Sequence, residues 1–146
     1  MRLHLIVIAV LVLFTALTHA EGDPTTQLHA ARSLRCNFGP GTSTEWTGSK
    51  PKTSIARFDQ DVQFDSIDIK NHSARIIGYL GASDIKVFVT EVGISFVETA
   101  PAVFDVTTVF PVYGEDHDFT AVDTRHVTSV GKAMAEQYYG ICKISQ

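Results

Sequence analysis

Residues 102–128 read AVFDVTTVFPVYGEDHDFTAVDTRHVT, and this stretch decides the fold. It is rich in Val, Thr and Phe, which suit the pleated surface of a β-sheet. The polar run at residues 114–118 divides it, so the pattern predicts two strands, at 102–112 and 119–128, joined by a turn. Because so short a connection cannot hold a crossover helix, we expect the two strands to be antiparallel.

The same sequence pattern extends towards the N-terminus, where short apolar runs alternate with turn residues. These runs predict further strands at residues 34–38, 58–69, 74–80, 85–92 and 94–98. Within 58–69 the apolar positions change parity, which predicts a β-bulge near Asp65 and Ser66. Strands that recur every 8–12 residues are typical of an antiparallel sandwich or barrel.

Residues 130–139 do not show the strand pattern, because residues with high helix propensity cluster around Ala133 and Glu136. We therefore expect a mainly β, single small domain: an antiparallel β-barrel or sandwich of six to eight strands with a short C-terminal helix or turn. The expected core consists of Phe64, Ile67, Ile69, Ile76, Val87, Val89, Phe96, Val106, Phe110, Phe119 and Val122.

The N-terminus has the three-part layout of a secretory signal peptide. Arg2 precedes an almost unbroken apolar run at residues 5–17, and Thr18 and Ala20 are small residues at the two positions that a signal peptidase inspects. The run is about thirteen residues long, short of the roughly 20 that span a bilayer, which disfavours the alternative of an uncleaved anchor. We expect a signal peptide at 1–20, a flexible leader at 21–32 and a disulfide-closed β domain at 33–146, secreted or periplasmic.

The chain holds two cysteines, Cys36 and Cys142. An even count in an oxidising compartment favours a disulfide, the alternative being two free buried thiols. The bond would place the two Cα atoms roughly 4.4–6.8 Å apart. It would tie the first strand to the end of the chain.

The formal net charge is −4, and removal of residues 1–20 takes away one Arg and no acid, which leaves −5. This balance argues against a nucleic-acid partner and against a basic membrane-binding surface. No cofactor motif is present in the sequence. The expected partner is another envelope or extracellular protein.

One polar cluster carries candidate chemistry: Asp116, His117, Asp118, Asp123, Arg125 and His126. His and carboxylate side chains are common Zn²⁺ ligands. However, nine residues of extended strand would separate His117 from His126 by roughly 30 Å, so we expect a solvated turn and no metal site. The weak catalytic candidates are His126, Asp123 and Arg125, with Asp105 as another orienting acid. No GxSxG elbow accompanies them.

Three further groups have alternative interpretations. Four acids, at positions 59, 61, 65 and 68, suit the solvent face of a strand better than the carboxylate pair of a glycosidase. Asn71 begins an Asn-His-Ser sequon in a predicted turn, and it would be glycosylated in a eukaryote. The aromatic residues are candidates for a binding face or for packing: Trp46, Tyr79, Tyr113, Tyr138 and Tyr139.

Four segments carry a resemblance: residues 36–39 (CNFG), 107–110 (TTVF), 121–126 (AVDTRH) and 137–142 (QYYGIC). In these segments the chain resembles small secreted proteins of Gram-negative bacteria, a likeness that implies no particular activity. In architecture it is also similar to periplasmic inhibitors of C-type lysozyme, small β-barrels with a Cys near each end. Their inhibitory motif, a Ser-Gly pair followed closely by Tyr, does not occur here, so no residue is carried over.

Three hypotheses for function follow. The first is a binding or inhibitory module of the cell envelope or extracellular space. The second is a small exported hydrolase that uses His126 and a nearby carboxylate. The third is a structural envelope component without a ligand. The lack of a catalytic motif favours a protein that is not an enzyme.

Overall fold

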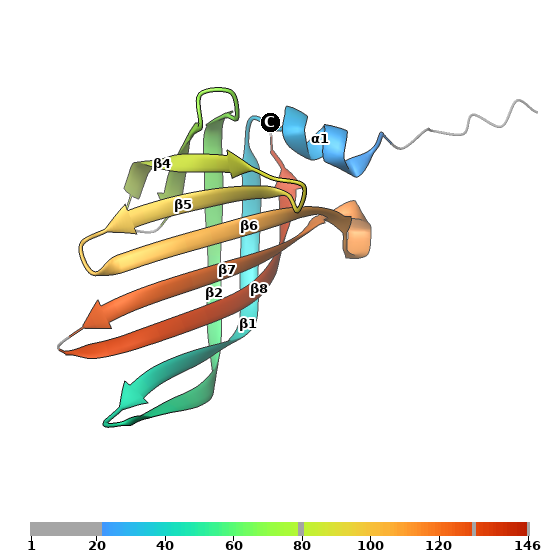
Figure 1. Ribbon diagram of the computed structural model, residues 1–146. Helices are drawn as coiled ribbons and strands as arrows, with labels where there is room; N and C mark the ends of the chain where they lie inside the picture. Colours follow the sequence, from blue (N-terminus) through green and yellow to red (C-terminus); the bar gives the residue numbers. More distant parts are fainter. Residues whose placement is uncertain (1–21, 79–80, 130, 146) are drawn as a thin grey trace, which may run out of the picture.

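The computed structural model describes residues 22–78, 81–129 and 131–145 (Figure 1). The predicted signal peptide lies outside these residues. The elements, in chain order, are α1 (Pro24–Ala30), β1 (Leu34–Thr47), β2 (Lys50–Asp68), β3 (Ser73–Gly78), β4 (Gly81–Val89), β5 (Ile94–Ala100), β6 (Val103–Tyr113), the 3₁₀ turn η1 (Glu115–His117), β7 (Phe119–Ser129) and β8 (Lys132–Ile144).

The strands form one antiparallel sheet that closes on itself. Each strand pairs with the next along the chain, and β1 also pairs with β8. The predicted mainly β, antiparallel fold is therefore confirmed. The predicted C-terminal helix is wrong, because residues 132–144 form β8, which pairs with β7 on one side and β1 on the other. The predicted bulge is confirmed: the register of β2 against β3 shifts between Asp65 and Asp68, and Ser66 has a φ of 52°.

The pairing of β1 with β8 closes the ring, and the disulfide lies in this pairing. Cys36 and Cys142 are directly opposite one another and fully buried, and the predicted bond between them is confirmed. Their Cα atoms are 4.0 Å apart, slightly below the expected range. The strands also touch closely at Gly41 and Gly140, where a Cβ atom would collide with the carbonyl oxygens of the facing strand.

Helix α1 replaces the flexible leader that we expected. Its first turn is fixed by Asp23, whose carboxylate accepts a hydrogen bond from the Thr26 N–H at 2.9 Å, and by Pro24 at the first helical position. Leu28 and Ala31 are buried among the core residues. The helix therefore packs on the barrel, beside the chain end (Figure 1).

The two ends of the barrel differ. Near α1 the interior is filled by apolar side chains, with the rings of Phe64 and Phe96 stacked 4.1 Å apart. Of the expected core residues, five are buried as predicted, namely Phe64, Ile67, Val87, Phe96 and Phe119. Ile69 and Ile76 pack partly buried against the core. The prediction that Val89 belongs to the core is wrong, since Val89 is 37% exposed. Three other expected core residues are half-buried outside the core: Val106, Phe110 and Val122.

The opposite end, where the β3–β4, β5–β6 and β7–β8 turns lie, is less filled. There β2 pairs with β3 only from Gln63 onwards, whereas its pairing with β1 extends to Lys50. Among the described residues, β2 thus has a sheet partner on one side only between Lys50 and Val62. No helix within the described ranges is long and apolar enough to cross a bilayer.

Breaking the disulfide tests the closure of the ring. The bond joins residues 106 positions apart, so the loop-entropy estimate of its contribution is about 4–5 kcal/mol. We expect the Cys36→Ala, Cys142→Ala double variant to lose most of this free energy of unfolding in guanidinium titrations, while its far-UV circular dichroism stays that of a β protein. Equal stability of the two proteins would contradict this assignment.

Candidate functional site

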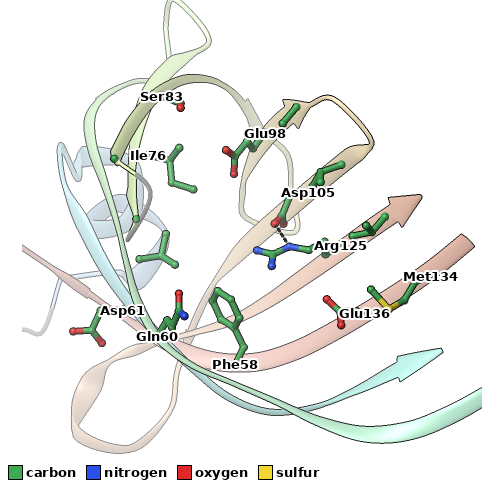
Figure 2. Close-up of a pocket in the computed structure, with 16 residues that line it drawn as sticks. Phe58, Gln60, Asp61, Ile76, Ser83, Glu98, Asp105, Arg125, Met134 and Glu136 are labelled. Carbon is green, nitrogen blue, oxygen red and sulfur yellow. Dashed lines mark hydrogen bonds and ion pairs between the residues drawn. The ribbon is translucent and has the colours of Figure 1, made fainter. Parts of the chain in front are cut away.

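A cavity of about 460 Å³ occupies the less filled end of the barrel. Apolar side chains line its walls: Phe58, Val62, Ile76, Val103, Val127 and Met134. Charged side chains enter it from β5 to β8, and Glu98, Asp105, Arg125 and Glu136 are drawn in Figure 2. Its volume falls within the range typical of small-ligand sites, roughly 300–1,000 Å³.

The four charged residues form one row across four strands. In the register, Glu98 on β5 lies opposite Asp105 on β6, which lies opposite Arg125 on β7, which lies opposite Glu136 on β8. A second row one step deeper contains Thr107, Asp123 and Tyr138. Because side chains alternate between the two faces of a strand, both rows face inwards.

Arg125 is held by two contacts. Its Nε donates a hydrogen bond to Asp105 Oδ2 at 2.8 Å, and its guanidinium carbon lies 5.0 Å from the centre of the Phe58 ring. The latter is a cation–π distance. Asp105 is only 6% exposed, so this ion pair is largely shielded from solvent and fixes the direction of the guanidinium (Figure 2).

Asp123 and Asp105 form a coupled carboxyl pair below Arg125. Thr107 Oγ1 donates to Asp123 Oδ1 at 2.7 Å, while Asp123 Oδ2 and Asp105 Oδ1 are buried and have no other hydrogen-bond partner among the described residues. Burial, and then the charge and hydrogen bond of Asp105, raise the pKa of Asp123 to about 7. A proton on Asp123, shared with Asp105, lowers the negative charge of the pair, and each of these oxygens can still accept a hydrogen bond from a further donor.

The pKa values of Glu98 and Tyr138 are also raised in this interior. Burial, followed by the charge of Asp105, raises the pKa of Glu98 above its usual value. Burial, followed by the charge of Glu136, raises the pKa of Tyr138 to about 12. In each case a negative charge is disfavoured, first because the group is removed from water and second because a carboxylate lies nearby.

The structure separates the residues that the sequence grouped together. Asp123 and Arg125 face the interior, whereas His126 points outwards, with its ring 6.2 Å from that of Phe104. His126 is exposed, and no hydrogen bond joins it to an acid among the described residues. The arrangement of His126 with Asp123 or Asp105 that the hydrolase hypothesis requires is therefore not formed.

The acidic candidates of β2 and Asn71 lie at the outer surface, although Asp61 also borders the cavity, and the aromatic candidates are divided between the core and the surface. Asp59, Asp61 and Asp65 form ion pairs with arginines, and Asp68 caps the turn that contains the exposed Asn71. No group of three or more His, Cys, Asp and Glu side chains in the described residues is arranged to hold a metal ion. Tyr138 is buried, Tyr113 packs partly buried, Trp46 and Tyr139 are about half exposed, and Tyr79 lies outside the described residues.

Sequence reasoning missed Glu98, Glu136 and Phe58 as neighbours of Arg125. It also expected Val106 and Val122 inside, whereas their neighbours Asp105, Thr107 and Asp123 are buried. The sequence did contain a signal for this polar face, because the charged residues 123 and 125 are two positions apart within the predicted strand at 119–128. Polar residues repeating at every second position of a strand mark one face, and that face is the interior.

No protein-family model, curated protein or solved structure matched this chain.

Replacement of Asp123 by Asn tests the shared proton. The folded-state pKa of Asp123 lies above the ordinary value of 3.8, so the folded protein holds this proton more tightly than the unfolded chain. The resulting stabilisation is complete below about pH 4 and is lost as the pH rises through about 7. We expect wild type to lose stability relative to Asp123→Asn between pH 5 and pH 8 in urea titrations. A difference that does not change with pH would refute the shared proton.

Proposed function

We propose that this protein is an exported binding module that holds a small, partly apolar molecule inside its barrel. The observation that carries the proposal is the cavity of about 460 Å³, with apolar walls and a few polar groups converging at its base. Small-molecule sites have this composition, and barrels of eight strands are just wide enough to hold one small ligand.

The polar groups support binding because they are held in place before any ligand arrives. Arg125 is fixed by Asp105 and by the ring of Phe58, and Asp123 is fixed by Thr107. Rigid groups lose little conformational entropy when a ligand binds. Export is supported by the disulfide, which oxidising compartments favour, and by the signal-like residues 1–20.

A protein partner is the second candidate, favoured by an outer groove of about 490 Å³ near the same end of the barrel. Trp46 and Phe104 line this groove and are 52% and 45% exposed, and exposed aromatic residues often anchor protein interfaces. Stoichiometric recovery of one purified partner by wild type, but not by Trp46→Ala, would favour this candidate.

The neutral fluorescent probe N-phenyl-1-naphthylamine tests whether the cavity takes a ligand. We expect wild type to bind it and Val103→Trp to bind it at least tenfold more weakly, because an indole at position 103 would fill the cavity that Val103 lines. Phe88→Trp is the matched control, because Phe88 is exposed and lines neither the cavity nor the outer groove. Equal binding by both variants and wild type, with unchanged circular dichroism, would count against the proposal.

A further inference from the structure

We propose that the molecule held in the barrel carries a positively charged amine or guanidine, which Glu98 and Glu136 bind at the base of the cavity. This inference rests on the proposed function, and it adds the chemical class of the ligand. Four observations carry it: the excess of carboxyl groups, the engagement of Arg125, two partly unpaired buried carboxyls, and the aromatic and apolar walls.

Among the described residues that line the cavity, carboxyl groups outnumber the single cation, Arg125. Arg125 faces Glu98, Asp105, Asp123 and Glu136, all on β5 to β8. Even with Asp123 neutral, three carboxyl groups remain for one guanidinium. Away from bulk water such an excess of like charge is unfavourable, and a cation from outside would relieve it.

Arg125 is poorly placed to receive an anion. Asp105 occupies its Nε, Phe58 lies against its plane, and Glu136 is its neighbour in the register on the other side. A carboxylate or phosphate approaching the guanidinium would meet Glu98 and Glu136, which also line the cavity (Figure 2). The site therefore disfavours anions by repulsion as well as favouring cations.

Glu98 and Glu136 are available to a ligand. Neither forms an ion pair with a described residue. Glu136 accepts a hydrogen bond from the Tyr138 hydroxyl, which leaves its second carboxylate oxygen for a ligand. They stand at the two ends of the charged row, on β5 and β8, with Asp105 and Arg125 between them. An ammonium or guanidinium has several N–H donors, so it can engage acceptors on more than one strand.

The floor of the cavity supplies a second and independent sign of an absent polar partner. Asp105 and Asp123 are 6% and 4% exposed, and each has one oxygen without a described partner other than the proton they share. A void of about 20 Å³, lined by Glu98, Asp105 and Asp123 among others, adjoins them. It is large enough for one water molecule or one small polar group.

Cation binding should displace protons from this interior. The groups that face the site are Glu98 on β5, Asp105 on β6, Asp123 and Arg125 on β7, and Glu136 and Tyr138 on β8, while Asp61 of β2 is paired outside with Arg35. A bound cation favours the ionised form of the raised carboxyls, Asp123 and Glu98. Proton release near pH 7 should accompany binding of a cation and should be reduced in Asp123→Asn.

The charge preference of the cavity can be tested with three probes that share a phenylalkyl body and carry a cationic, a neutral or an anionic end group: 4-phenylbutylamine, 4-phenylbutanol and 4-phenylbutyrate. Each competes with N-phenyl-1-naphthylamine on the full mature protein, and titration calorimetry in two buffers at pH 7 counts the protons released. We expect the amine to bind most tightly and the carboxylate least tightly. Glu98→Gln and Glu136→Gln should each weaken the amine about tenfold or more and leave the alcohol unchanged.

Glu91→Gln is the matched control, because Glu91 is exposed in the β4–β5 turn, outside the cavity lining. It should leave all three affinities as in wild type. If the alcohol or the carboxylate binds as tightly as the amine, or if no probe displaces the reporter, the cationic ligand is ruled out while the binding barrel stands. If the reporter itself does not bind wild type, or binds Val103→Trp equally well, the proposed function fails as well.

Discussion

The pairing of β1 with β8 is the constraint on which the rest of this structure depends. Without it, eight strands in sequence would form an open sheet with two free edges and two solvated faces. With it, one face of the sheet becomes an interior. The disulfide between Cys36 and Cys142 lies within this pairing, and Gly41 and Gly140 allow the two backbones to approach where any Cβ would collide.

Closure gives the charged residues their properties. On an open sheet Asp105, Asp123 and Arg125 would face water, and their charges would be screened. Inside the barrel Asp105 and Asp123 are almost fully buried, so their coupling, the ion pair with Arg125 and the raised pKa of Asp123 follow from the shape of the sheet. The apolar half near α1 supplies stability, which leaves the other half free to carry polar groups that a packed core would exclude. This division of the barrel leaves a cavity lined by charged and apolar side chains at one end.

Much of the fold could be predicted from the sequence, because alternation and turn residues are local signals. The strands at 102–112 and 119–128 and the bulge at Asp65 and Ser66 came from such signals. The disulfide was predicted from the even number of cysteines and the expected oxidising compartment. Residues 132–144 could not be predicted in this way, since the helix propensity around Ala133 and Glu136 is overridden by pairing on both edges. Helix α1 has a local start signal, Asp23 before Pro24. It was not predicted because its seven residues are too few to show a clear helical repeat of apolar positions. The site was only half predictable: Asp123 and Arg125 were singled out, but the face they occupy depends on closure, and their neighbours come from distant strands.

The contact between Arg125 and Phe58 tests the account most directly. These residues belong to β7 and β2, which are not neighbours in the sheet, so their side chains meet only across a closed interior, where the guanidinium carbon lies 5.0 Å from the ring centre. Nuclear Overhauser spectra of the mature protein should show cross-peaks between the Arg125 side-chain protons and the Phe58 ring, with slowed exchange of the Arg125 Nε proton. Absence of these cross-peaks, together with solvent-rate exchange of that proton, would contradict a charged interior in a closed barrel.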